Sequence, residues 1–211
     1  MINIRPEVSP KRLLILLKAI DYGYKKEKKL IDLLSPSQLT KNTIKKLINF
    51  AEEIQLISRT NDDLFNEHQI DLNNEIEFAY KLCQLLYKDN DFVKILRKIL
   101  NQPLRYSGLT LDEFNTQLSI ELKNIVLNKE NILGLRFWLN YLGFVYIVSK
   151  KPARMNINIF NRIMYILNIY SFNDNMPIDV FLEELITQHP ELESLVDKRS
   201  NQVKKTLTNP L

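Results

Sequence analysis

Lysine and asparagine side chains recur between residues 41 and 49, at a spacing that places them together on one side of a helix. The residues concerned are Lys41, Asn42, Lys45, Lys46 and Asn49. Lysine neutralises phosphate charge and asparagine bonds to the edges of bases, so this combination is typical of a helix that contacts nucleic acid. Because the N-terminal residues of such a helix lead into the major groove, Lys41 and Asn42 are the foremost candidates.

The basic residues are concentrated near the N-terminus. The 211-residue chain has a net charge of only +4, yet residues 1–50 hold eleven Lys and Arg against four Asp and Glu. A local basic surface favours an anionic partner, duplex DNA above all. The alternative is that these lysines only solvate helix faces. Asp62 and Asp63, in a predicted turn, would repel phosphate. The candidates for additional backbone contacts are Lys25, Lys26, Lys28 and Lys29.

No set of residues indicates catalysis. His68 and His189 are the only histidines, and neither has a partner at zinc-ligand spacing. Cys83 lies among leucines, which predicts a small buried side chain. We therefore expect no cofactor, no metal site and no enzymatic activity. The paired glutamates are expected at solvated helix positions: Glu183, Glu184, Glu191 and Glu193.

Helical periodicity and turn residues define the elements that position the basic side chains. The pattern predicts one helix from Pro10 to Gly23, a second from about Lys25 to Leu34, and a third capped by Thr40. A strand at 55–59, a turn at 61–63 and a return strand at 64–66 follow. Three helices and a β-hairpin are the order of a winged helix-turn-helix. The third helix would bury Ile44, Leu47, Ile48, Ala51 and Ile54.

The same order recurs at an offset of 88 residues, where Leu30 falls on Leu118, Leu34 on Leu122 and Thr40 on Asn128. An accidental match of amphipathic helices is the alternative. We expect a mainly α fold with short β-hairpins, made of tandem winged helix-turn-helix modules at 1–72 and 91–160. A connecting helix at 73–90 and a C-terminal helical segment at 161–211 complete it. Further matched positions are Ile44, Leu47, Phe50, Ile54 and Leu56 with Ile132, Leu135, Trp138, Leu142 and Phe144.

The third helix of the second module is aromatic where that of the first is basic. Phe137, Trp138 and Tyr141 occupy much of the side that the core does not need. Such a surface normally packs against something. We expect the C-terminal helices of the same chain to cover it, with a partner protein as the alternative. The wing of this module is basic and could contact a phosphate backbone through Lys150, Lys151 and Arg154.

Composition excludes several other classes. Four glycines are too few for glycine-rich phosphate loops or an all-β architecture. Cys83 is the only cysteine, so no intramolecular disulfide can form. The N-terminal residues contain no apolar signal core, and the apolar runs are far shorter than the roughly 20 residues of a membrane-spanning helix. We therefore expect a cytoplasmic protein.

Four segments resemble tandem winged-helix proteins of bacterial phage-defence and DNA-modification islands, in particular the winged-helix accessory proteins of the deazaguanine DNA-modification cluster. They are “KRLLILLKAI”, “IKKLINFAEEIQLI”, “LRFWLNYLGFVYI” and “PIDVFLEELITQHPEL”, the last similar to a “FLxxLxxxHPxL” pattern of that group. Gln55 departs from the glycine usual at this position, which Gly143 supplies in the second copy. The resemblance implies a non-catalytic DNA-binding component of a defence complex with partner proteins. The alternative is an interaction subunit, similar to the tandem winged helices that bind kleisins in chromosome-organising complexes.

Overall fold

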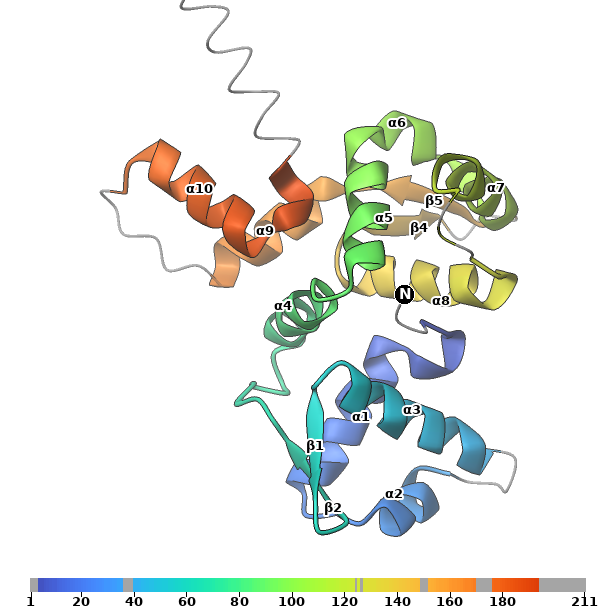
Figure 1. Cartoon of the computed structure of the whole chain (residues 1–211), viewed down its shortest axis with the longest axis vertical. Coiled ribbons are helices and arrows are strands. Elements are labelled where there is room, and N and C mark those ends of the chain that lie inside the picture. Colours follow the sequence, from blue (N-terminus) through green and yellow to red (C-terminus); the bar gives the residue numbers. More distant parts are fainter. Residues whose placement is uncertain are drawn as a thin grey trace, which may run out of the picture.

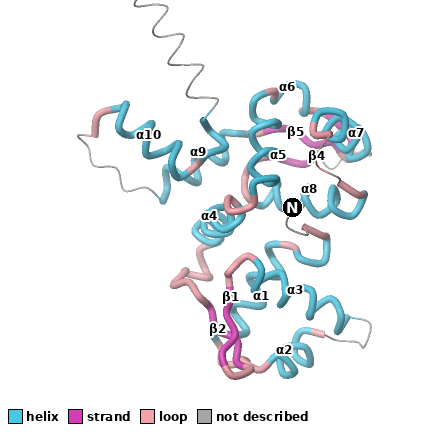
Figure 2. Tube along the Cα trace, in the orientation of Figure 1, coloured by secondary structure: helices cyan, strands magenta, loops and turns pink. Residues whose placement is uncertain are grey.

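The computed structural model describes residues 4–35, 40–123, 125, 127–148, 152–169 and 176–193. These residues form a mainly helical structure with two small antiparallel sheets, which confirms the predicted mainly α class. The sheets lie in separate halves of the molecule, with helix α4 (Glu75–Leu86) between the halves (Figure 2). None of the described helices combines the length and apolarity that a membrane crossing requires.

The first half contains three helices and a hairpin, as predicted. Pro10 begins the first helix, and Gly23, with a φ of +98°, follows its last turn in a conformation that suits glycine. The predicted core positions of the third helix are all buried. The elements are η1 (Pro6–Val8), α1 (Pro10–Asp21), α2 (Glu27–Leu34), α3 (Lys41–Glu53), β1 (Ile57–Thr60) and β2 (Asp63–Asn66).

Thr40 precedes α3 as expected, but it does not cap the helix with its side chain. Its hydroxyl instead forms a hydrogen bond with the hydroxyl of Ser35, across a segment whose middle residues lie outside the described ones. Residues 36–39, between the predicted second and third helices, lie outside the described residues.

The second half repeats the order with extra pieces. Thr110 and Asn128 cap the second and third helices of the repeated order through capping boxes, and Asn128 is the residue that the sequence matched to Thr40. Helix α6 and strand β3 did not follow from the sequence pattern. The elements are α5 (Asn90–Asn101), α6 (Pro103–Tyr106), β3 (Leu109–Thr110), α7 (Leu111–Glu121), α8 (Lys129–Tyr141), β4 (Val145–Val148) and β5 (Arg154–Ile157).

The strand pairing shows a further similarity between the two halves that the sequence comparison did not reveal. In the first half β1 pairs with β2, and an isolated bridge joins Lys26, just before α2, to Asp63 of β2. In the second half β4 pairs with β5, and Thr110, just before α7, pairs with Arg154 of β5. The pair Lys26–Asp63 in the first half therefore corresponds to the pair Thr110–Arg154 in the second. In each pair the residue just before the second helix bonds to the second strand of the hairpin.

The predicted offset of 88 holds for the third helices but not for the second ones. Helices α3 and α8 begin at Lys41 and Lys129, 88 residues apart, whereas α2 and α7 begin at Glu27 and Leu111, 84 residues apart. The core residue that follows from the shorter offset is Phe114, opposite Leu30, and both are fully buried. Helix α7 is three residues longer than α2, which contributes to the shift.

Two further helices, α9 (Ile159–Ile169) and α10 (Ile178–Gln188), and the short turn η3 (Pro190–Leu192) follow the second sheet. Helix α9 packs on α4, and η3 packs on α5. Figure 1 shows α9 and α10 together at one side of the molecule, away from α1–α3.

Residues 4–8, which we call the N-terminal strap, lie between the two third helices. The turn η1 within the strap contacts both α3 and α8, and Figure 1 shows the beginning of the chain between the two halves. Ile4 and Val8 are buried there. The buried residues of both halves, with Ile4 and Val8 of the strap among them, form one continuous hydrophobic core.

Candidate nucleic-acid interface

The exposed side of α3 carries three of the predicted residues in one line. Asn42, Lys45 and Asn49 are exposed, and their spacing of three and four residues places them on neighbouring turns of one helix face. Within the described part of the chain, Lys45 takes part in no ion pair. This line presents one free ammonium group between two amides, a set able to bind a phosphate and the edge of a base together.

Lys41 and Lys46 lie beside this line and are already engaged. The ammonium of Lys41 is 3.9 Å from Asp32 of α2, and that of Lys46 is 3.3 Å from Glu7 of the strap. A backbone hydrogen bond, with Lys46 adding to it, holds the pKa of Glu7 below its usual value. Lys46 therefore fixes the strap to α3 as well as adding positive charge.

The lysines before and within α2 lie next to the hairpin. The ammonium of Lys25 is 4.6 Å from the ring centre of Phe65, and that of Lys26 is 2.9 Å from Asp63. Lys28 is exposed, as is Lys29. Because Lys26 pairs with Asp63, one of the two acidic groups at the hairpin turn is neutralised, which reduces the repulsion expected of this wing.

Arg59 of β1 joins three elements of the first half. Its guanidinium lies 2.9 Å from Glu27 of α2 and 2.9 Å from Glu52 of α3. Planar guanidinium groups suit such paired carboxylate contacts. Arg59 therefore fixes α2, α3 and the hairpin relative to one another. Its positive charge is balanced by the carboxylates of Glu27 and Glu52.

The aromatic residues of α8 are largely buried, Trp138 most deeply. Its side chain is fully buried, its ring centre is 5.6 Å from that of Phe50 in α3, and its indole N–H donates to the carbonyl of Val8 at 3.0 Å. Tyr141 is half-buried with its ring against Phe78 of α4. Phe137 alone of the three stays 39% exposed.

The covering segment is the N-terminal strap, and not the C-terminal helices as expected. Asn131 of α8 donates to the carbonyl of Ile4 at 3.3 Å. A Cβ on Gly134 would lie 2.7 Å from that same carbonyl oxygen and 2.8 Å from Arg5, too close for any other residue without a backbone shift. Helix α8 therefore packs against the strap on one side, while Glu130, Phe137 and Asn140 remain exposed on another.

The predicted basic wing of the second module is described only in part. Lys150 and Lys151 lie outside the described residues. Arg154 is exposed in β5, and its guanidinium donates to the carbonyl of Gly108. This bond ties Arg154 to the turn before β3.

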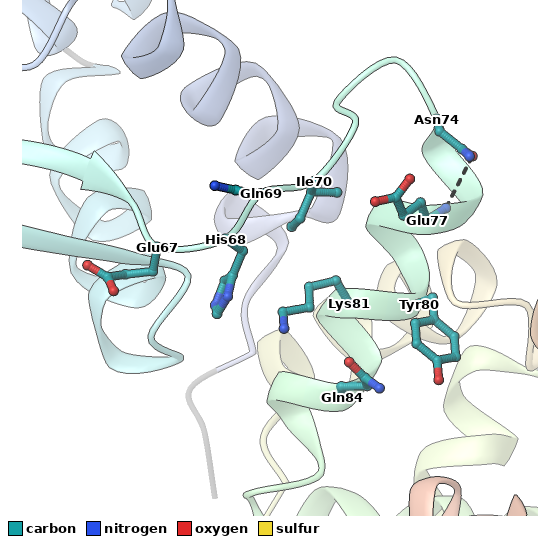
Figure 3. A pocket seen from close by; sticks show the side chains of 9 residues that line it. All are labelled: Glu67, His68, Gln69, Ile70, Asn74, Glu77, Tyr80, Lys81 and Gln84. Atoms are coloured by element: carbon teal, nitrogen blue, oxygen red, sulfur yellow. Dashed lines mark hydrogen bonds between the residues drawn. The ribbon is translucent and has the colours of Figure 1, made fainter. Parts of the chain in front are cut away.

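A cavity of about 580 Å³ opens between the linker after β2 and helix α4. Figure 3 shows His68 and Lys81 pointing into the same space, with Glu77 and Gln84 nearby. The Nε2 of His68 is 2.9 Å from the carbonyl of Gln55, and burial lowers the pKa of its imidazole. The lining mixes both signs of charge with amides, so its chemistry favours no single ligand class.

A buried charged cluster joins α4, α9 and η3, and the sequence did not predict it. Arg162, His189 and Glu191 are fully buried, so the expectation that Glu191 is a solvated helix position is wrong. The guanidinium of Arg162 is 3.6 Å from Glu191 and donates to the hydroxyl of Tyr87 at 3.0 Å, and Tyr87 donates to Glu191. One signal was present in the sequence: Arg162 is the only charged residue of α9.

Burial sets the protonation of this cluster. It lowers the pKa of His189 to about 3, with the charge of Arg162 acting in the same direction. Burial also raises the pKa of Glu191, an effect that Arg162 and Tyr87 partly offset. Cys83, next to the cluster, is a buried thiol whose pKa burial raises to about 12. These groups are closed off from solvent, so the cluster fixes the C-terminal helices to α4 and α5.

Within the described ranges, no group of three or more His, Cys, Asp and Glu residues is placed to hold a metal ion. Comparison of the chain with protein-family models, with curated proteins and with solved structures finds no match.

Proposed function

We propose that this chain is a non-catalytic tandem winged-helix protein that binds duplex DNA through α3 of its first module. The observation that carries the proposal is the exposed line of Asn42, Lys45 and Asn49 on a helix whose opposite side is buried. Lysine contacts with phosphates supply affinity, and asparagine contacts with base edges supply selectivity. The resemblance noted in the sequence adds the setting, a bacterial defence or DNA-modification system with partner proteins.

The element order supports the winged-helix part of the proposal. Each half has three helices and a hairpin in the same order, with the short helix α6 added in the second half. In both halves a short segment before the second helix of that order pairs with the last strand. In helix-turn-helix proteins the last helix of such a set enters the major groove while the one before it crosses the backbone. Helix α3 would then read the groove, and Lys25, Lys28 and Lys29 would contact phosphates beside it.

Charge reversal on α3 tests the proposal. Lys41→Glu with Lys45→Glu should weaken binding to a labelled duplex by at least about tenfold at low salt, and each lost phosphate contact should reduce the salt slope by about one. Both side chains are at the surface, where the ion pair of Lys41 with Asp32 stabilises the fold by less than about 1 kcal/mol. Fluorescence anisotropy over a salt series gives both quantities.

The matched control is Lys123→Glu with Lys129→Glu, which makes the same charge change on exposed positions of the second module. Lys129 begins α8 as Lys41 begins α3. The control should bind like the unchanged protein. Equal affinity and salt slope for all three proteins, or equal loss in both variants, would contradict a site on α3.

A further inference from the structure

A cavity of about 320 Å³ lies between α1, the end of α2 and the first half of α3. Most of its lining is apolar, and two threonine hydroxyls and one guanidinium group complete it. Small-molecule sites in proteins combine an apolar lining with a few polar groups in this way, and their volumes begin at about 300 Å³. The apolar part of the lining consists of Ile15, Leu34, Ile44 and Leu47.

The chain itself covers this apolar lining only in part. Ile44 and Leu47 are buried, whereas Leu34 is half-buried and Ile15 is 54% exposed. Because these side chains surround one space, their exposed surface is contiguous, and contiguous exposed apolar surface marks an interaction site. An apolar group that fills the cavity would remove this surface from water, which is favourable.

Two polar side chains of the lining have hydrogen-bonding groups that the described part of the chain does not use. Arg12 donates one hydrogen bond, from Nη1 to the backbone carbonyl of Glu7 at 3.0 Å, and its other N–H groups are left for a ligand. The hydroxyl of Thr43, a half-buried residue, has no hydrogen-bond partner among the described residues. The residues that line this cavity include no acidic side chain, in contrast to Glu67 and Glu77 in the cavity beside α4. The charge of Arg12 therefore favours an anionic ligand group.

We propose that this cavity binds a small carboxylic acid with an apolar tail. A guanidinium group holds a carboxylate through two parallel hydrogen bonds, so Arg12 would bind the acid group and Thr43 would donate a further bond to it. The tail would lie against Ile44 and Leu47. Inorganic phosphate or sulfate has no apolar part and would leave that surface uncovered. At about 30 Å³ for each group of the size of a water molecule, the cavity holds roughly ten non-hydrogen atoms, the size of octanoate.

The cavity lies on the side of α3 that is turned toward α1. Ile44 and Leu47 are on this side, and the exposed line of Asn42, Lys45 and Asn49 is on the opposite side of the same helix. An acid in the cavity would therefore contact α3 without covering that line. The site and its test do not depend on DNA binding.

Titration of the full chain with octanoate at about pH 7.5, followed by two-dimensional NMR of the backbone amides, tests the site. The signals of Arg12, Ile15 and Thr43 should shift together, with a dissociation constant on the order of 0.1–1 mM for a ligand of this size. Octan-1-ol has the same tail without the charge and should bind about three- to tenfold more weakly. This comparison of two compounds needs no variant of the protein.

Two substitutions at exposed positions separate the roles of the charge and the cavity. Arg12→Gln should remove the preference, so that octanoate and octan-1-ol bind with equal, weak affinity. Arg105→Gln makes the same change at an exposed residue of α6 and should keep the preference. Ile15→Trp should close the cavity and abolish the octanoate shifts. Because Arg12 and Ile15 are exposed, both variants should fold.

The inference is wrong if octanoate at about 10 mM leaves the amides around the cavity unshifted. Equal affinity of the unchanged protein for octanoate and octan-1-ol would exclude an acid as the ligand. Shifts that gather on exposed apolar residues of α9, such as Phe160 and Leu167, would show that octanoate only coats apolar surface, which also overturns the site.

Discussion

Helices α3 and α8 are the same element in two different surroundings. Each has 13 residues, and each begins 14 residues before a left-handed residue, Gln55 or Gly143, that precedes a strand. The equivalent positions that both helices bury are Ile44, Leu47, Phe50 and Ala51 in α3 and Ile132, Leu135, Trp138 and Leu139 in α8. They differ on the other side. There α3 presents Asn42, Lys45 and Asn49 to solvent. The equivalent positions of α8 hold Glu130, Leu133 and Phe137, of which Glu130 and Phe137 are exposed. Because the strap contacts both helices, the two surfaces differ in the residue types that each helix carries.

A second difference between the two helices lies at one pair of equivalent buried positions. Phe50 and Trp138 stand at the same place in the two helices and meet each other ring to ring. The larger indole reaches the strap and bonds to Val8. Trp138 therefore connects the core of its own half both to the strap and to α3.

Removing the indole should break this arrangement and give the largest effect. Trp138→Ala should lower the free energy of unfolding by about 3–5 kcal/mol, because it leaves a large cavity and removes the partner of the Val8 carbonyl. Denaturant unfolding followed by circular dichroism measures it. Phe137→Ala, at the adjacent and partly exposed aromatic, should cost much less, about 1 kcal/mol or below. Similar costs for both changes would mean that Trp138 does not join the modules.

Acid should destabilise the protein through the buried cluster of Arg162, His189 and Glu191. His189 is neutral in the folded chain because its pKa is about 3, but it takes up a proton near pH 6.5 once unfolded. The unfolded state thus binds more protons between these values, so stability is retained above pH 6.5 and falls as the pH decreases toward 3.

The variant His189→Gln isolates this contribution, since glutamine does not titrate. Between pH 6.5 and 5 the unchanged protein should lose about 2 kcal/mol relative to the variant. Urea unfolding at several pH values gives the difference. A difference that is constant with pH would show that His189 is protonated in the fold, next to Arg162.

Periodicity and capping residues were enough to predict most of the helices and the core of α3, because those features depend on neighbours in the sequence. The surroundings of Trp138 and Glu191 depend on segments more than 100 residues away, namely Val8 for the indole and Tyr87 for the carboxylate. An aromatic side chain on a helix and a glutamate near a helix end look like surface residues until the covering segment is known. The line on α3 could be predicted because nothing described in the chain covers it.

The turns that follow α3 and α8 have nearly the same backbone geometry but different residues. Gln55 has a φ of +59° and Gly143 a φ of +82°, and each follows the last residue of its helix by the same step. The hydrogen bonds agree as well, from Leu56 to Ala51 and from Phe144 to Leu139, the pattern of a helix end closed by a left-handed residue. Glycine adopts this conformation freely, whereas glutamine adopts it at a cost of about 1–2 kcal/mol.

Replacing the glycine and replacing the glutamine should therefore change the free energy of unfolding in opposite directions. Gly143→Ala should destabilise the protein by about 1 kcal/mol, because the left-handed strain exceeds the entropy lost from the unfolded chain. Gln55→Gly should stabilise it by about 0.5 kcal/mol, since relief of strain exceeds the loss of the side-chain hydrogen bond from Lys88 at the surface. Both values come from denaturant midpoints at constant slope. If Gln55→Gly instead destabilises the protein, the bond between Gln55 and Lys88 outweighs the backbone strain, and the two turns differ in what stabilises them although their geometry is the same.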